Sequence, residues 1–287
     1  MGSTGIFRAL LIVPLGVLSG CSSLLYHPYR DHVVSKERYG KAVEDVWFSS
    51  RDGTKLHAWY LPSKKPAKAV VVLFHGNGEN ISTHTSSLSW LTDEEFPVFA
   101  FDYQGYGKSD GDPSPEGTVE DGKAAVRKIT HEKHLPVVIY GQSLGGAIAL
   151  RAAIEMKGEQ PIRGIVADST FASYRSVGKR VLSRHPITWL FQPLAYVLLS
   201  DAHAPKGRIA ELEGTPLLVI HGDQDSLVDA DFGRQVFEEA REPKVLWVIP
   251  GGRHIDVFYR DKGAYRKRFL EWLRTTVAAV VPNSLSP

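Results

Sequence analysis

Residues 136–156 read PVVIYGQSLGGAIALRAAIEM, and this stretch decides the fold. A short apolar run, Val137–Tyr140, precedes a G-x-S-x-G pattern at residues 141–145, and the helix-forming stretch Leu144–Met156 follows it. A serine on such a sharp strand-to-helix turn exposes its hydroxyl, because the flanking glycines leave space where side chains would collide. The context predicts that Ser143 is a nucleophile. The alternative is an ordinary glycine-rich turn.

Short runs rich in valine and isoleucine recur along the chain. Such runs are typical of buried parallel strands. Helical segments separate most of them, which indicates a mostly parallel sheet with helices on both faces. Turn residues at Arg51–Thr54 predict a hairpin between the first two strands, and Ser114 with Pro115 predicts the start of a helix that runs toward Thr130. The predicted strands are Val43–Phe48, Lys55–Leu61, Ala69–Phe74, Val98–Phe101, Val137–Tyr140, Ile162–Ala167, Leu217–Ile220 and Val245–Ile249.

One connection is too long for an ordinary crossover. About 50 residues separate the strand ending near Ala167 from the strand starting at Leu217. This segment contains an apolar and aromatic run, Ile187–Leu199. We predict that about residues 171–210 form a small helical cap over the active edge of the sheet. An enlarged helix that packs into the core is the alternative.

A serine needs a base to take its proton, and the base needs a carboxylate to fix its tautomer. His254 lies just after the last predicted strand, behind the turn at residues 250–253. Asp225 lies in the loop after the preceding strand. We predict that His254 is the general base and Asp225 its acid partner. Asp223, in the same loop, and Asp168, which ends an earlier strand, are the rival carboxylates.

The oxyanion of an acyl-transfer reaction needs two preorganised N–H donors. The backbone of Leu144 supplies the first predicted donor, and the backbone of Asn77, in the loop His75-Gly76-Asn77-Gly78, supplies the second. For that loop, an ordinary Gly/Asn turn is the alternative. Two other histidines, His75 and His221, each end a strand before a glycine, and we predict structural hydrogen bonds for them.

The motifs together resemble those of the α/β-hydrolase superfamily. They are FHGNG at 74–78, FDYQGYGKSDG at 101–111, YGQSLGG at 140–146, IHGDQD at 220–225 and PGGRH at 250–254. Within the superfamily the chain is similar, over about residues 40–275, to small-cap, serine aminopeptidase-like hydrolases, which include depalmitoylating thioesterases. The resemblance implies an eight-stranded, mostly parallel sheet flanked by helices. It also implies a structural role for Asp102 and a place for Tyr103 in the pocket wall.

The amino-terminal residues resemble a bacterial lipoprotein signal. Arg8 precedes the apolar run Ala9–Leu18, which is too short to span a membrane, and Ser19-Gly20-Cys21 follows. We expect cleavage before Cys21 and lipidation of this residue, and Ser22 favours the outer over the inner membrane of the cell envelope. A cleaved secretory signal with a chance cysteine is the alternative. The expected organisation is therefore signal peptide 1–20, tether 21–42, hydrolase domain 43–280 and tail 281–287.

The overall composition excludes several other classes of protein. The chain has 287 residues, a formal net charge of +2 and one cysteine, so neither an intrachain disulfide nor a cysteine-based zinc site is expected, and nothing favours nucleic acid. We expect no metal or cofactor. The predicted activity is cleavage of an ester or thioester of a hydrophobic acyl group. A peptidase or amidase, with Glu79 holding a substrate ammonium, and a non-catalytic lipoprotein remain the alternatives, and the sequence leaves the oligomeric state open.

Overall fold

A computed structural model describes residues 25–184 and 186–279, and an eight-stranded sheet is its centre. The strand order is β1-β2-β4-β3-β5-β6-β7-β8, in which β1 pairs antiparallel with β2, β2 pairs antiparallel with β4, and all other pairs are parallel. The strands are β1 (Glu44–Ser49), β2 (Lys55–Leu61), β3 (Val70–Phe74), β4 (Val98–Phe101), β5 (Val137–Gln142), β6 (Ile162–Asp168), β7 (Leu217–Gly222) and β8 (Lys244–Ile249). All eight predicted strands and the β1–β2 hairpin are confirmed.

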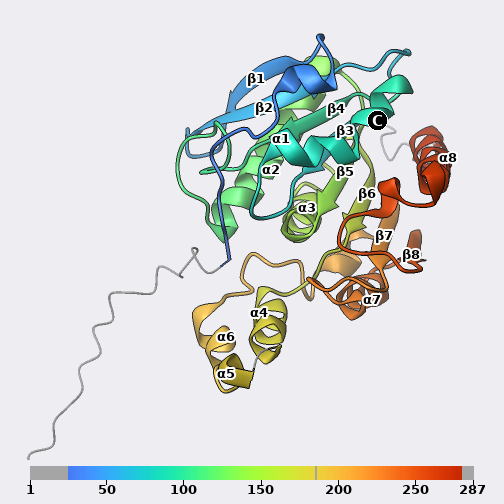
Figure 1. Cartoon of the computed structure of the whole chain (residues 1–287). Helices are drawn as coiled ribbons and strands as arrows, with labels where there is room; N and C mark the ends of the chain where they lie inside the picture. The colour runs from blue at the N-terminus through green and yellow to red at the C-terminus, as the bar shows by residue number, and fades with distance from the viewer. Residues whose placement is uncertain (1–24, 185, 280–287) are drawn as a thin grey trace, which may run out of the picture.

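The central parallel strands are buried on both faces, which explains why they are nearly continuous apolar runs. Successive side chains of a strand point to opposite faces. In β3, Val70, Val72 and Phe74 belong to one core cluster, and Val71 and Leu73 belong to the other. Helices α2 (Pro115–Lys133), α3 (Leu144–Glu155) and α7 (Ala230–Glu239) cover the first face, whereas α1 (Ile81–His84) and α8 (Ala264–Ala278) cover the second (Figure 1).

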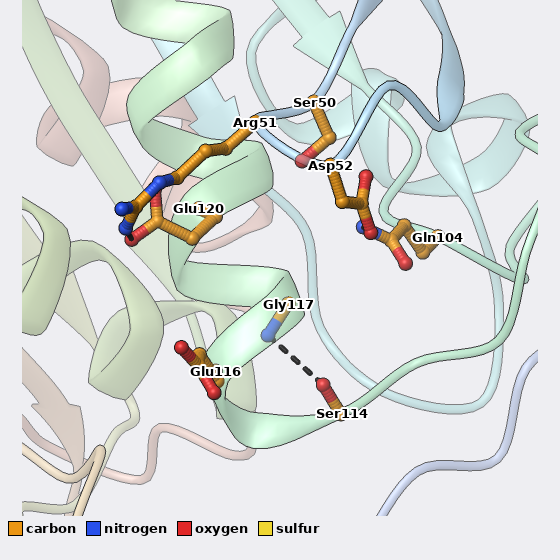
Figure 2. A pocket seen from close by; sticks show the side chains of 8 residues that line it. All are labelled: Ser50, Arg51, Asp52, Gln104, Ser114, Glu116, Gly117 and Glu120. Carbon is orange, nitrogen blue, oxygen red and sulfur yellow. Dashed lines mark hydrogen bonds and ion pairs between the residues drawn. The ribbon is translucent and has the colours of Figure 1, made fainter.

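Helix α2 (Pro115–Lys133) begins where the sequence signal predicts. Ser114 Oγ accepts the N–H of Gly117, with Pro115 in the first turn of α2 (Figure 2). The α-helices are α1 (Ile81–His84), α2 (Pro115–Lys133), α3 (Leu144–Glu155), α4 (Tyr174–Ser183), α5 (Pro186–Trp189), α6 (Gln192–Leu198), α7 (Ala230–Glu239) and α8 (Ala264–Ala278). Short 3-10 helices lie at Lys36–Tyr39, Thr85–Ser87, Ser89–Asp93, Ile209–Leu212, Val257–Tyr259 and Asp261–Gly263.

The long connection between β6 and β7 folds into α4, α5 and α6. These helices pack on one another and form a separate lobe beside the body of the fold (Figure 1). The predicted small helical cap is therefore present. An enlarged helix buried in the core is wrong for this segment, because most large apolar side chains of α5 and α6 are exposed.

The described part of the predicted tether, from Leu25 on, is docked on the fold. Tyr26 is buried, and its hydroxyl lies 3.1 Å from Thr118 Oγ1. The carbonyl of Tyr29 accepts the N–H of Gly107, and the guanidinium of Arg30 donates to two carbonyls of the loop after β4. We call residues 25–33 the arm. Most of its hydrogen bonds use backbone groups of the arm, and such bonds leave no pattern in the sequence. The sequence therefore did not reveal them.

Several predictions concern residues outside the described ranges. The signal peptide 1–20, the lipidation of Cys21 and the tail 281–287 fall there, and they stay predictions. Among the residues that are described, no helix has the length and apolarity that crossing a membrane requires.

Candidate active site

Ser143 sits on a strained turn between β5 and α3. Its φ and ψ of 53° and −120° are rare for a residue other than glycine, and strain of this kind is found at functional sites. The backbone holds it from both sides, because its N–H donates to Asp168 O at 2.8 Å and its carbonyl accepts Thr170 Oγ1 at 2.6 Å. The turn therefore presents the serine side chain at the carboxyl edge of the sheet.

The glycines of the pattern are required by close approach. A Cβ on Gly145 would lie 2.2 Å from Phe74 O at the end of β3, and a Cβ on Gly141 would lie 2.5 Å from Gly146 Cα. Any side chain at these two positions would push α3 away from the sheet. The strand–turn–helix context predicted at the sequence level thus has a steric basis.

His254 and Asp225 meet at the same edge, from the loops after β8 and β7. His254 Nδ1 lies 2.7 Å from Asp225 Oδ2, and Asp225 Oδ1 accepts the N–H groups of Leu227 and Val228. Burial alone would raise the pKa of Asp225, but hydrogen bonds from His221 and His254 outweigh burial and hold the pKa well below its usual range. Asp225 is therefore an anion that can orient His254 and stabilise its protonated form.

The two rival carboxylates have other partners. Asp223 Oδ1 accepts the N–H of Gly251 at 2.7 Å and so ties the β7 loop to the β8 loop. Asp168 Oδ2 accepts the hydroxyl of Tyr140 at 2.7 Å, and burial raises the pKa of Asp168 to about 6. Among the three carboxylates, only Asp225 has a hydrogen bond to His254 within the described part of the chain.

Two hydrogen bonds connect the segments that carry His254 and Ser143 to the end of β6. Ile255 N donates to Ser169 Oγ at 3.2 Å, and Ser169 follows the residue whose carbonyl holds Ser143. Neither Ser143 Oγ nor His254 Nε2 has a hydrogen-bond partner among the described residues, so both are available. Their mutual hydrogen bond is not formed here. In free enzymes such bonds are often long and tighten when substrate binds.

The two predicted oxyanion donors lie beside Ser143 in one cavity. Among the described residues, neither the N–H of Leu144 nor the N–H of Asn77 has an acceptor. The side chain of Asn77 is hydrogen-bonded through both of its polar atoms: Oδ1 accepts His27 N at 2.8 Å and Tyr106 Oη at 2.7 Å, and Nδ2 donates to Leu25 O at 2.7 Å. The sequence did not reveal this side-chain role, because two of the partners are backbone groups of the arm.

The cavity at Ser143 has a volume of about 400 Å³ and an apolar wall. Cap, arm and β7 loop all contribute to the wall. Its residues are Leu25, His27, Asn77, Ser143, Leu144, Phe171, Val177, Gly178, Val181, Leu182, Phe191, Leu194, Ala195, Leu198, Leu199, Leu227 and Val228. None of these is Asp, Glu, Lys or Arg, so the cavity suits an uncharged, hydrophobic group.

Tyr103 does not line this cavity, and the expectation of a pocket-wall role is wrong. Its ring is buried among Phe74, Phe101 and His75, and its hydroxyl donates to His75 O at 3.4 Å. Tyr103 is the second residue after β4, and its side chain is buried in the core. The predicted structural hydrogen bonds of the other histidines are present: His75 Nδ1 lies 2.7 Å from Gly76 O, and His221 Nε2 lies 2.8 Å from Val228 O.

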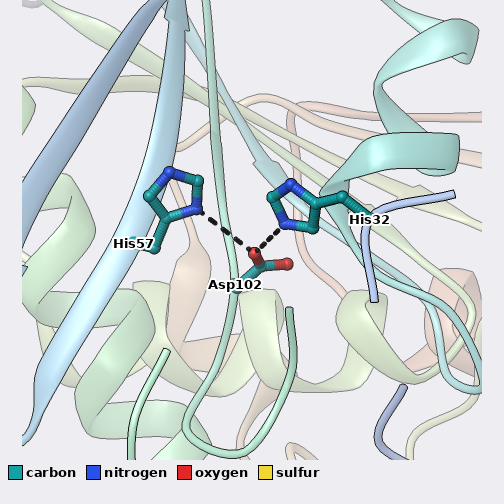
Figure 3. Close-up of side chains that lie close together, drawn as sticks. All are labelled: His32, His57 and Asp102. Carbon is teal, nitrogen blue, oxygen red and sulfur yellow. Dashed lines mark hydrogen bonds and ion pairs between the residues drawn. The ribbon is translucent and has the colours of Figure 1, made fainter. Parts of the chain in front are cut away.

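Asp102 has the structural role that the resemblance implies. Its Oδ1 accepts the N–H of Ile81, and its Oδ2 lies 3.2 Å from His32 Nε2 and 3.5 Å from His57 Nδ1 (Figure 3). On its other side, His57 Nε2 lies 2.7 Å from Asp45 Oδ1. The three facing ligand atoms are close enough to surround a metal ion. Direct imidazole–carboxylate pairing accounts for the same distances, and it joins the arm to β2 and β4.

A second hollow, of about 460 Å³, lies between the β1–β2 turn and the start of α2 (Figure 2). Its lining is polar and includes Asp52, Gln104, Glu116 and Glu120. None of the predicted catalytic residues belongs to it. The cavity at Ser143 is therefore the candidate active site.

A sheet of this strand order, with a serine on a strained turn after its central parallel strand, is the architecture of the α/β hydrolases. Solved structures agree with this classification. The esterase Pf2001 of Pyrococcus furiosus superposes with a TM-score of 0.67 at 22% identity, over 87% of this chain and 96% of that one. The family model described as "Serine aminopeptidase, S33" matches residues 65–207.

Sequence relatives show which protein family the chain belongs to. The chain is 35% identical over 240 residues to the uncharacterized protein YfhR of Escherichia coli strain K12, over 81% of each protein. It is 27% identical over 238 residues to the uncharacterized membrane protein YNL320W of Saccharomyces cerevisiae, over 81% of this chain and 80% of that protein. The chain belongs to the same protein family as YfhR, and the family model together with the α/β-hydrolase fold supports a hydrolase.

Proposed function

We propose that this protein is a serine esterase or thioesterase for hydrophobic acyl groups. The observation that carries the proposal is the cavity at Ser143, whose wall is apolar and contains no charged Asp, Glu, Lys or Arg side chain. A cavity of about 400 Å³ lies within the range of sites for small molecules, which is about 300–1,000 Å³. The esterase activity named for Pf2001 is consistent with this proposal.

The mechanism follows from the atoms at the sheet edge. His254 Nε2 takes the proton of Ser143 as Oγ forms a bond to the substrate carbonyl carbon. Asp225 holds Nδ1–H and stabilises the resulting imidazolium, while the N–H groups of Leu144 and Asn77 donate to the oxyanion. The alcohol or thiol leaves with the proton from His254, and a water molecule then hydrolyses the acyl-enzyme by the same route.

A peptidase of the aminopeptidase type is the weaker candidate. Such an enzyme needs a carboxylate near the site to pair with the substrate ammonium. Glu79 is exposed and does not line the cavity, and no other Asp or Glu of the described chain does. Turnover of aminoacyl-coumarin amides at rates comparable with esters would favour the peptidase.

The test is a chain-length series of p-nitrophenyl esters and matched acyl thioesters. We expect kcat/KM to rise from acetyl to longer acyl groups, because each methylene buried in the cavity contributes about 0.8 kcal/mol. A fluorophosphonate probe should label the protein and should fail to label Ser143→Ala. Activity confined to acetyl esters would contradict the acyl preference, and labelling that persists in Ser143→Ala would contradict the nucleophile.

We also propose that the protein is a lipoprotein held in the cell envelope by acyl chains on Cys21. The support is the lipobox-like sequence at residues 18–21. Metabolic labelling with a palmitate analogue tests the assignment. Label should enter the wild-type protein and be absent from Cys21→Ser; equal labelling of both would refute it.

A further inference from the structure

The cap exposes an apolar surface that does not belong to the acyl cavity. Ile187, Leu190 and Val197 are 76%, 72% and 73% exposed. Trp189 is more than half exposed, and Tyr196 is half exposed. None of the five lines the cavity at Ser143. We call these five residues the cap patch. Several large apolar side chains exposed on one lobe are typical of an interaction surface.

The charge of the cap indicates what kind of surface the cap patch meets. Residues 174–200 contain four basic residues, Arg175, Lys179, Arg180 and Arg184, and no Asp or Glu. Arg180 and Arg184 share one carboxylate, that of Asp229. The lobe therefore keeps a net positive charge. Short helices with apolar and aromatic residues beside basic ones are typical of segments that lie in the headgroup region of anionic membranes.

The position of the patch relative to the cavity gives a second, independent argument. Phe191, Leu194 and Leu198 are exposed apolar residues that also line the cavity, so the apolar surface continues from the cap patch into the site. Leu25, the first described residue, lies in the same wall. Only three residues separate it from Cys21, so at about 3.5 Å per residue a lipid on that cysteine would lie within about 14 Å of the cavity.

We propose that the cap patch docks on the surface of an anionic phospholipid bilayer and opens the acyl cavity toward it. The amino-terminal anchor and the cap would then contact the same membrane. A hydrophobic acyl substrate could pass from the bilayer along the cap into the cavity without crossing water. The docking itself does not depend on catalysis, whereas the substrate route rests on the proposed esterase function.

The test uses the full chain with Cys21→Ser, which removes the proposed anchor, and Ser143→Ala, which removes any turnover. Its binding to vesicles of phosphatidylcholine and phosphatidylglycerol is measured by flotation. Replacing Ile187, Leu190 and Val197 together by serine should weaken binding at least about tenfold, because three large apolar side chains lose their contact with lipid. The matched control replaces Val33, Val245 and Val248, exposed apolar residues outside the cap, by serine and should bind like the parent.

The melting temperature of each variant establishes that it is folded. Binding that survives the triple cap change in a folded protein would overturn the proposal, and so would a parent that fails to float with the vesicles. If sedimentation instead shows a dimer that the cap change dissociates, the patch is an interface between copies and the proposal is wrong. A failed esterase assay would leave these results unaffected, so the two proposals are tested separately.

Discussion

At the scale of single residues, two neighbouring aspartates in one loop of the site have different roles. Asp225 faces His254, and Asp223 braces the loop through Gly251 N. The two residues are chemically identical and lie in one loop. Their roles differ because Asp225 accepts two further N–H groups and is buried, which fixes its charge next to the histidine.

This division predicts different effects of the same substitution. Asp225→Asn should lower kcat by about 10³-fold or more, because an amide cannot hold the required tautomer of His254 or stabilise its protonated form. Asp223→Asn should keep kcat within about tenfold, because its Oδ1 can still accept Gly251 N. Hydrolysis of p-nitrophenyl butyrate measures both. Equal losses in the two variants would contradict the assignment of the acid.

Site residues could be predicted from motifs where steric limits on the local backbone allow few residue types. The chain turn at Ser143 needs glycines for steric reasons, so it leaves a pattern in the sequence. The role of the Asn77 side chain could not be predicted, because two of its partners are backbone groups of the arm, about 50 residues away. Tyr103 was placed in the pocket wall by resemblance alone, and the packing of its ring against Phe74 and Phe101 decides otherwise.

At the scale of elements, apolar periodicity was enough to predict all eight strands. The carboxyl ends of three strands were predicted too early, because the apolar pattern stops before the strand does. β5, β6 and β7 extend one or two residues beyond the predicted ends, to Gln142, Asp168 and Gly222. These extensions bring the functional loops to the sheet edge. The arm has no periodicity, and its docking depends on hydrogen bonds to loops elsewhere in the chain, so an extended segment of this kind was interpreted as a tether.

Besides these hydrogen bonds, one buried ring, that of Tyr26, stabilises the docking of the arm. Tyr26→Ala should lower the free energy of unfolding by about 3 kcal/mol, since it empties a buried aromatic site and removes the bond to Thr118. It should also increase amide hydrogen exchange in residues 25–33. Tyr29→Ala, at a position 45% exposed, is the matched control and should change little. Unchanged exchange in the Tyr26 variant would show that the arm is held by other contacts.

At the scale of the whole molecule, buried ionisable groups couple stability to pH. Burial lowers the pKa of His75 from 6.5 to about 4. The unfolded chain therefore binds more protons than the folded one between these values. Burial raises the pKa of Asp121 and of Asp168 to about 6. For these two groups the folded chain binds more protons than the unfolded one in the acid range, so their contribution to stability falls as the pH rises. The net dependence of stability on pH is the sum of these opposed contributions.

The contribution of His75 can be isolated by comparison with a variant. Its stabilisation is fully present above pH 6.5 and is lost as the pH falls toward 4, by about 3 kcal/mol at about 1.36 kcal/mol per pKa unit. Between pH 7 and 4, the free energy of unfolding of the wild type should fall more steeply than that of His75→Gln. Urea titrations at several pH values measure this difference, with the exposed His131→Gln as control. Parallel curves for wild type and His75→Gln would refute it.

The docking of the arm has a practical consequence for anyone who shortens this protein. A fragment that starts near Glu44 would keep every strand, every α-helix and every proposed catalytic side chain described above. It would nevertheless lack Leu25 and His27, so one side of the acyl cavity would be open to water, and the Asn77 amide would lose two of its partners. Recombinant versions should therefore retain the residues from Leu25 onward, and tags belong at the carboxyl end.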